Sequence, residues 1–215
     1  MLIATHLHLS LPAFCLQADA LRLAPGESVW LQGANGAGKS TLLKSLAGIF
    51  MAGHAELSAY GKPLASAAVD YKQDVVYVGS LRRAYGHLTG AEVLAFARQF
   101  YRGWRRGLEL ELAAQLKLPL ELRVKHLSQG MNAKLNFLLA ACSGARIFLL
   151  DELLAPVDAE SKEVIGNFFL GRLAARDALV ICSHDDDPLT AAAGRRWTIA
   201  GGVFDMGRQP LERAA

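Results

Sequence analysis

Several features that define other protein classes are missing from this chain of 215 residues. It has only three cysteines, Cys15, Cys142 and Cys182, which are widely spaced and form no CxxC pair. This indicates buried thiols in a reducing cytosol rather than disulfides or a metal site. The formal net charge is only +3 and no block of Lys and Arg stands out, so we expect no nucleic-acid partner.

Long apolar runs are also lacking. Residues 1–14 have neither the basic start nor the continuous apolar segment of a signal peptide. No run reaches the roughly 20 apolar residues of a membrane-spanning helix. The strongest candidate, 147–154, is interrupted by Asp151 and Glu152. We therefore expect no direct membrane insertion, and any role at a membrane must come through a partner.

What the chain does contain is the pattern of an α/β protein. Hydrophobic residues make up 52% and charged residues 20%, which suits one globular domain with a sizeable core. Four short apolar runs have the character of buried parallel strands: 29–31, 75–78, 147–150 and 179–182.

Further elements surround these runs. Alternating residues at 3–11 and 18–23 indicate strands that precede the first buried strand. From about residue 88 to 141 the apolar residues recur at helical spacings, and a helix is expected at 159–175. The segment 197–205 resembles a hairpin around Gly201-Gly202. The overall pattern is an α/β core interrupted by a helical insert.

A glycine-rich loop follows the first buried strand and precedes a helical pattern. It satisfies GxxxxGK[ST], and its residues are Gly33, Ala34, Asn35, Gly36, Ala37, Gly38, Lys39 and Ser40, with Thr41 after them. Its backbone amides would surround phosphate oxygens, Lys39 would reach the β- and γ-phosphates, and Ser40 would ligate Mg²⁺. The bland alternative is a glycine turn without a ligand, because the four fixed positions match by accident in about one chain per hundred of this length. The strand before and helix after it favour a nucleotide.

Two carboxylates end the buried strand at 147–150. Parallel sheets bind ligands at the carboxyl ends of their strands, so Asp151 would help hold Mg²⁺ and Glu152 would polarise the attacking water. Taken alone, two acids after a strand indicate only a helix start.

The segment Leu127-Ser128-Gln129-Gly130-Met131 precedes an apolar helix. Ser128 is a natural N-cap, so a simple helix start is one interpretation. A helix N-terminus with a free hydroxyl is also an anion site.

The order of these motifs along the chain resembles that in the ATPase subunits of ABC transporters. The motifs are the phosphate loop, the LSxG helix start, a strand ending in Asp-Glu and a strand ending in His. The resemblance covers nearly the whole chain. It implies a P-loop NTPase (RecA-like) α/β core with an N-terminal antiparallel β subdomain and a helical insert that carries the signature motif. On this basis we expect one domain, 1–215, with the catalytic core and β subdomain at 1–79 and 143–215 and the helical subdomain at 80–142.

The resemblance also implies that two subunits pack head to tail around ATP and Mg²⁺. Ser128 and the backbone of Gly130 would then bind the γ-phosphate held by the partner's Lys39. Asp158 matches the aspartate that lies along the dimer seam. His184 matches the switch histidine that orients Glu152 and the water, although a lone His after a strand is more often structural.

Departures from the family pattern affect other positions. Ser80 stands where the family has a metal-contacting glutamine, and Gln129 and Met131 replace residues of the usual LSGGQ. The run 153–158 departs from the usual Pro-Thr-Ser-Gly-Leu-Asp. Phe14 is the only nearby candidate for stacking on adenine.

Two features resemble the small bacterial ABC-2-type exporter ATPases: the LSxGM signature and the aromatic cluster at 100–104, for which core packing is the alternative. That branch implies a separate membrane permease, export of a peptide or other amphipathic compound, and a cytoplasmic location at the inner face of the cell membrane. Arg82, Arg83 and Tyr85 would flank the docking cleft, or else form a solvated face.

Two other readings compete. A soluble ABC-type ATPase in DNA repair or translation generally carries two ATPase halves or a long coiled coil, and neither pattern is present. A P-loop GTPase or small-molecule kinase leaves the LSQG segment unexplained and lacks an evident Asn-Lys-x-Asp motif. A neighbouring membrane protein would distinguish a transporter subunit from the first alternative. A nucleotide competition assay would distinguish it from the second.

Overall fold

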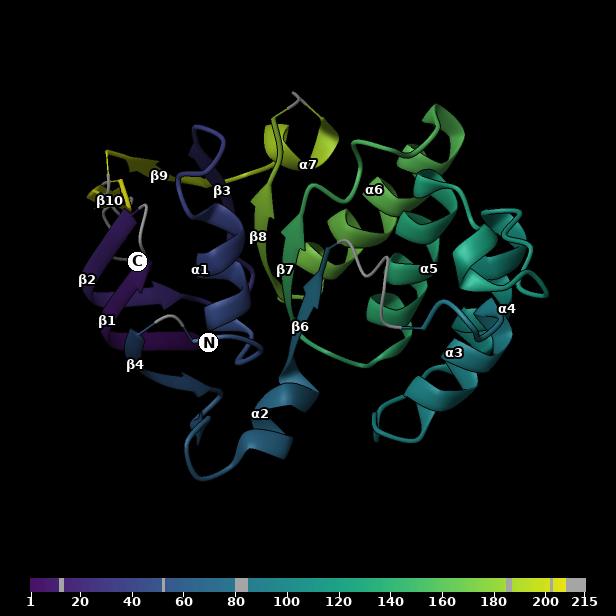
Figure 1. The fold of residues 1–215 in the computed structure, drawn as a ribbon, viewed down its shortest axis with the longest axis horizontal. Helices are drawn as coiled ribbons and strands as arrows, with labels where there is room; N and C mark the ends of the chain where they lie inside the picture. Colours follow the sequence, from purple (N-terminus) through teal and green to yellow (C-terminus); the bar gives the residue numbers. More distant parts are fainter. Residues whose placement is uncertain (12–13, 52, 80–84, 185–186, 202, 208–215) are drawn as a thin grey trace.

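The computed structural model describes residues 1–11, 14–51, 53–79, 85–184, 187–201 and 203–207. Two sheets and two groups of helices form successive layers (Figure 1). The antiparallel sheet lies at one side, helix α1 (Lys39–Leu46) lies between it and the middle strands of a larger sheet, and the remaining long helices lie on the far side of that larger sheet.

The antiparallel sheet has the strand order β2-β1-β4-β5. Its strands are β1 (Leu2–Leu11), β2 (Phe14–Leu23), β4 (Gly53–Ala59) and β5 (Lys62–Pro63). In β1 the fully or almost fully buried residues are Leu2, Ala4, Leu7 and Leu9. The buried residues switch from even to odd positions between Ala4 and Leu7, because the register with β4 shifts between Thr5 and His8. This irregularity explains why the alternation in the sequence is only approximate.

The larger sheet has the strand order β10-β9-β3-β8-β7-β6. Its strands are β3 (Ser28–Gly33), β6 (Val75–Val78), β7 (Ile147–Asp151), β8 (Ala178–Cys182), β9 (Arg195–Ala200) and β10 (Val203–Asp205). All are parallel except β10, which pairs antiparallel with β9. The hairpin expected near the C-terminus and the four buried strands are confirmed.

Both faces of this sheet are covered, which is why its central strands are continuous apolar runs. Ile147 and Leu149 of β7 pack in the core shared with α1 and the antiparallel sheet. Phe148 and Leu150 pack on the opposite face in a second core. That core includes residues of α5 (Gln129–Cys142) and α6 (Ala159–Ala174).

The helical segment between β6 and β7 comprises α3 (Gly90–Arg98), α4 (Arg106–Gln115), a short 3₁₀ turn at Val124–His126, and α5. A capping box between Thr89 and Glu92 starts α3. The buried Glu109 of α4 accepts hydrogen bonds from Trp104 Nε1 at 2.7 Å and from Arg98 at 3.4 Å. These bonds join the two helices at a charged group that burial would otherwise destabilise.

The α/β P-loop architecture with its antiparallel sheet and helical insert agrees with the expected fold class. The helix at 159–175 is present as α6, one residue shorter. Sequence patterns did not indicate β4, β5 and the short helices α2 (Ala68–Asp74) and α7 (Pro188–Ala191). In the part of the chain that the structure describes, no helix combines the length and apolar character needed to cross a bilayer.

Candidate active site

The glycine-rich loop connects the end of β3 to the start of α1. Gly38 is the residue before α1 and has φ 102°, a left-handed conformation that favours glycine. Lys39, the first residue of α1, is only 6% exposed, and its Nζ donates to the carbonyl oxygens of Gly33 at 2.7 Å and Ala34 at 3.1 Å. The ammonium group is therefore held inside the curve of the loop, beside the helix N-terminus that would receive phosphate.

His184 lies between the lysine and an acid. Its Nε2 is 3.5 Å from Lys39 Nζ and 3.3 Å from Glu152 Oε1. A neutral Nε2 can accept from the lysine, whereas a protonated Nε2 can donate to the carboxylate. About half of each of the Glu152 and His184 side chains is exposed, at 51% and 46%. The acid and the histidine therefore face solvent, next to a buried cation.

Glu152 has an unusual backbone. Its φ is +51°, and its amide donates to Cys182 O at 2.9 Å, which ties the residue after β7 to the end of β8. A left-handed residue other than glycine costs of order 1–3 kcal/mol and is found most often at functional sites. This turn directs the carboxylate away from the strand and toward His184.

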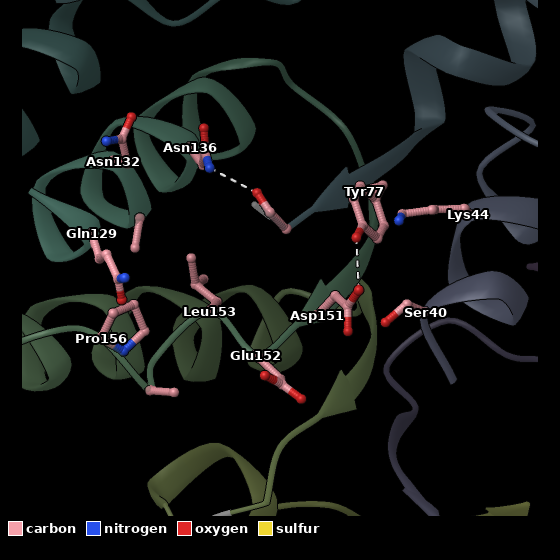
Figure 2. Close-up of a pocket in the computed structure, with 13 residues that line it drawn as sticks. Ser40, Lys44, Tyr77, Gln129, Asn132, Asn136, Asp151, Glu152, Leu153 and Pro156 are labelled. Atoms are coloured by element: carbon pink, nitrogen blue, oxygen red, sulfur yellow. Dashed lines mark hydrogen bonds between the residues drawn. The ribbon is translucent and has the colours of Figure 1, made fainter. Parts of the chain in front are cut away.

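Asp151, the last residue of β7, faces a different set of groups. Tyr77 Oη donates to Asp151 Oδ2 at 2.6 Å, and Figure 2 shows the Ser40 hydroxyl directed toward the same carboxylate. Ser40 and Asp151 line one cavity. A hydroxyl and a carboxylate are the hard oxygen donors that Mg²⁺ prefers, and two protein groups leave most of its coordination sphere for phosphate and water. The residues present thus fit Mg²⁺.

This cavity has a volume of about 560 Å³ and separates the phosphate loop from the start of α5. Ser40 and Lys44 of α1 lie on one side, and Gln129, Asn132 and Asn136 of α5 lie on the other (Figure 2). Asn136 is buried, and its Nδ2 donates to Gly79 O at 2.7 Å. The signature helix is therefore bonded to the residue that follows β6.

The signature residues occupy the N-terminus of α5. Ser128 Oγ accepts a hydrogen bond from Met131 N at 3.1 Å, so the predicted N-cap is confirmed. A Cβ at Gly130 would lie 2.6 Å from Pro156 O, so this glycine is needed for close packing against the loop after β7. Among the described residues, no hydrogen bond or ion pair joins Ser128 to Lys39 or Glu152.

Asp158 caps α6 and also contacts α5. Its side chain accepts from Ser161 N at 2.9 Å and pairs with Lys134 Nζ at 2.7 Å. The hydrogen bond from Lys134 is the largest reason that the pKa of Asp158 is held well below its usual range. The exposed carboxylate therefore stays charged at neutral pH.

Comparison with known proteins agrees with this geometry. A sequence model of the family described as "ABC transporter" matches residues 16–155. The cytochrome c biogenesis ATP-binding export protein CcmA of Bordetella bronchiseptica is 32% identical over 167 residues, covering 76% of this chain and 75% of its own. The CcmA protein of Sodalis glossinidius is 28% identical over 180 residues, covering 82% and 84%.

Solved structures share the fold. The ATP-binding subunit of an ABC transporter superposes with a TM-score of 0.83 at 22% identity and covers 94% of this chain and 87% of its own. A dimeric post-hydrolysis ATP-binding cassette bound to ADP and Pi gives a TM-score of 0.79 at 19% identity and covers 98% and 100%.

The chain belongs to the ABC transporter ATP-binding family. As an ABC ATPase it binds and hydrolyses ATP in service of a transporter. The expected family and the expected enzyme class are both confirmed. The roles of individual residues in this ABC ATPase stay predictions.

Some predicted residues of the ABC ATPase lie outside the described part of the chain. Ser80, at the position of the family's glutamine, and Arg82 and Arg83 are among them, and so is the side chain of Phe14. All three cysteines are free, and Cys142 and Cys182 are buried as expected, but Cys15 is exposed on the antiparallel sheet, so the expectation of a buried thiol is wrong there. Cys182 is buried beside Asp151, and burial raises the pKa of its thiol to about 12.

Sequence patterns did not indicate two side chains of the site, Tyr77 and Asn136. Tyr77 links β6 to Asp151, and Asn136 links α5 to the residue after β6. One available signal was the polar Asn136 within the otherwise apolar stretch 135–141. For Tyr77 the signal was weaker, because an aromatic residue is ordinary in a buried strand.

Proposed function

We propose that this ABC ATPase hydrolyses Mg·ATP in a head-to-tail dimer of two copies and so drives a separate membrane-spanning permease. The observation that supports this most is the line of three groups, Lys39, His184 and Glu152, with contacts of 3.5 and 3.3 Å. A cation, a histidine and an acid in this order suit charge neutralisation and proton removal around a γ-phosphate.

Each group has one task in this proposal. Lys39, released from the carbonyls of Gly33 and Ala34, binds phosphate oxygens together with the amides at the start of α1. Ser40 and Asp151 hold Mg²⁺, which supplies positive charge that offsets the charge developing on the phosphates. Glu152 accepts the proton of the attacking water, and His184 holds that carboxylate in place.

The second copy would complete the site. Within the described part of one chain, Ser128 makes no bond to the phosphate loop, yet it presents a hydroxyl at the exposed start of a 14-residue helix. Such a helix start is an anion site of its own. We infer that Ser128 and Gly130 bind the γ-phosphate held by Lys39 of the other copy, while Asp158 lies at the seam between them.

Mixing two inactive variants tests the shared site. Lys39→Ala and Ser128→Arg should each abolish hydrolysis alone, because each lesion affects both sites of a dimer made of identical copies. In a mixed dimer, one site combines the intact Lys39 of one copy with the intact Ser128 of the other. Single-turnover ATP hydrolysis should therefore reappear on mixing.

A matched mixture provides the control. Lys39→Ala mixed with Ser40→Ala should stay inactive, because both lesions lie in the same half of each site. If Lys39→Ala and Ser128→Arg fail to complement each other while wild-type protein hydrolyses ATP, the dimeric site is wrong. Loss of monomer nucleotide binding in Ser128→Arg would contradict a role across the seam.

A second, apolar hollow would receive the permease. A groove of about 420 Å³ lies between α2 and α3, and it contains Val69, Tyr85, Phe96 and Phe100. Phe100 is 59% and Val69 64% exposed, although both are large and apolar. The rings of Phe96 and Phe100 pack edge to face with centroids 4.9 Å apart. Clustered exposed aromatics of this kind are typical of protein interfaces.

Export is the direction that the relatives favour, since those reported above are named as export proteins. We propose an exporter whose cargo is a peptide or other amphipathic compound, as the LSxGM signature and the aromatic cluster at 100–104 suggest. The ATPase would then lie in the cytoplasm at the inner face of the cell membrane. Export assays with a membrane protein that co-purifies with the ATPase would test the cargo class.

A further inference from the structure

Tyr77 lies beside the proposed metal site, on the edge strand β6. It pairs with Leu149 of β7, so its side chain lies on the same face of the sheet as Leu149 and Asp151. From there its Oη donates to Asp151 Oδ2 at 2.6 Å (Figure 2). A neighbouring strand therefore supplies a direct bond to the carboxylate that would hold Mg²⁺.

Two further groups, Gly79 and Lys44, border the phenol, and a third, Cys182, borders the carboxylate. A Cβ at Gly79 would lie only 2.3 Å from Tyr77 Oη, so the glycine leaves the space that the hydroxyl needs. On the other side, Lys44 Nζ of α1 lies 5.8 Å from the centroid of the ring, within the range of a cation–π contact. Cys182 of β8 flanks Asp151 opposite the phenol, and its thiol is a weak donor.

The Tyr77 hydroxyl is committed to this carboxylate. Its oxygen lies 2.6 Å from Asp151 Oδ2, within the range of a short hydrogen bond in which the phenol donates. The Asp151 side chain also lines the cavity that Ser40 lines, so a carboxylate held by the phenol still faces the place proposed for the ion.

We infer that Tyr77 is a positioning residue that orients the Asp151 carboxylate for Mg²⁺. This inference rests on the proposed Mg·ATP function, in which Asp151 and Ser40 hold the ion. Partners that hydrogen-bond a metal-binding carboxylate fix its rotamer, and their loss typically weakens metal binding by about 10- to 100-fold. Tyr77 would act only through Asp151, so it is not a catalytic residue.

The test measures metal binding directly. Tyr77→Phe keeps the ring and removes the hydroxyl. Mn²⁺ is titrated into the full-length protein with a non-hydrolysable ATP analogue, and free Mn²⁺ is measured by electron paramagnetic resonance. We expect Mn²⁺ to bind about 10-fold more weakly to Tyr77→Phe, while the analogue binds unchanged in EDTA.

Two further variants separate positioning from general damage. Tyr71→Phe is the matched control, because Tyr71 is also buried and donates to Leu46 O, away from Asp151. It should bind Mn²⁺ like the wild type. Gly79→Ala should weaken Mn²⁺ binding even with the tyrosine present, because the added methyl group displaces the hydroxyl.

A double-mutant cycle shows whether the effect passes through Asp151. In an Asp151→Asn background, Tyr77→Phe should cause no further loss of Mn²⁺ affinity. If Tyr77→Phe binds Mn²⁺ with wild-type affinity, or loses equal affinity with and without Asp151→Asn, this inference is wrong while the proposed function still stands. If wild-type protein binds no Mn²⁺ together with nucleotide, the proposed function fails and the inference with it.

Discussion

At the scale of single residues, the site combines a buried lysine with an exposed acid that has a left-handed backbone. Glu152 directly follows Asp151, yet the two carboxylates contact different groups, His184 and Tyr77. The left-handed φ of Glu152 turns its side chain out of the strand pattern that Asp151 follows. Two adjacent acids can therefore serve a proton and a metal separately.

Glu152→Gln tests the proton acceptor. The amide keeps the size of the side chain but cannot take a proton, so hydrolysis should fall by about 10²- to 10⁴-fold while ATP binding is retained. An ATP-bound dimer should accumulate and elute earlier in size-exclusion chromatography. Glu163→Gln, an exposed acid on α6, is the control and should hydrolyse ATP normally. Normal turnover in Glu152→Gln would show that another group is the base.

How much of the site was predictable depends on the kind of signal. The place of Lys39 and Ser40 at the start of a helix, after a strand and a loop, follows from a local motif, so the sequence alone indicated it, while their roles toward phosphate and Mg²⁺ stay predictions. The contact of Tyr77 with Asp151 was not predictable, because the register between β6 and β7 arises only when residues 75–78 and 147–150 pair. Sequence order indicates that strands exist, and their alignment depends on tertiary packing.

At the scale of elements, α5 joins the helical segment to the core at several points. Its start packs against the loop after β7 at Gly130, its Lys134 pairs with Asp158, and its Asn136 bonds to Gly79. These contacts are distributed over two turns of one helix. A shift of α5 would therefore be transmitted to both the acidic loop and the end of β6.

Asn136→Leu tests the contact to β6. Leucine suits the apolar neighbours but leaves the Gly79 carbonyl without its donor, which should lower the free energy of unfolding by about 1–3 kcal/mol. Urea denaturation measures this change. Asn167→Leu, at an exposed position of α6, should change stability by less than about 0.5 kcal/mol. Equal stability of Asn136→Leu and the wild type would show that this hydrogen bond contributes nothing.

Missed elements show where sequence patterns are too short. The helix α2 has seven residues, fewer than an isolated helix needs, and Asp74 at its end is held by Lys62 at 2.6 Å and Arg146 at 3.3 Å. Lys62 lies in β5 of the antiparallel sheet, and Arg146 lies immediately before β7 of the larger sheet, so both ion pairs depend on how the sheets pack. The long-range contacts of Asp74, and not the local propensity, explain this element.

At the scale of the whole molecule, the cavity beside the phosphate loop and the apolar groove both lie at the β6 edge of the larger sheet. The groove carries the proposed permease contact, and the cavity carries the proposed chemistry. Tyr77 and Asn136 line both hollows. The molecule therefore places its two proposed partners on either side of two shared side chains.

Phe100→Asp tests the groove. A charge among the aromatic rings should prevent docking, so the variant should no longer pull down a membrane protein that co-purifies with the wild type. ATP hydrolysis without that protein should stay within about two-fold of the wild type. Leu110→Asp is the matched control, because Leu110 is 57% exposed on α4 and lies outside the groove. Retained co-purification of Phe100→Asp would place the permease contact elsewhere.

The shared wall formed by Tyr77 and Asn136 has a consequence for energy exchange between the two sides. Suppose that a membrane protein bound against the rings of Phe96 and Phe100 displaces the side chains of Tyr77 and Asn136 and increases the affinity for ATP by some factor. ATP must then increase the affinity for the membrane protein by the same factor. The two affinities, each measured with and without the other ligand, would then form a closed thermodynamic cycle. Because the same two side chains line both hollows, such reciprocity needs only a short route.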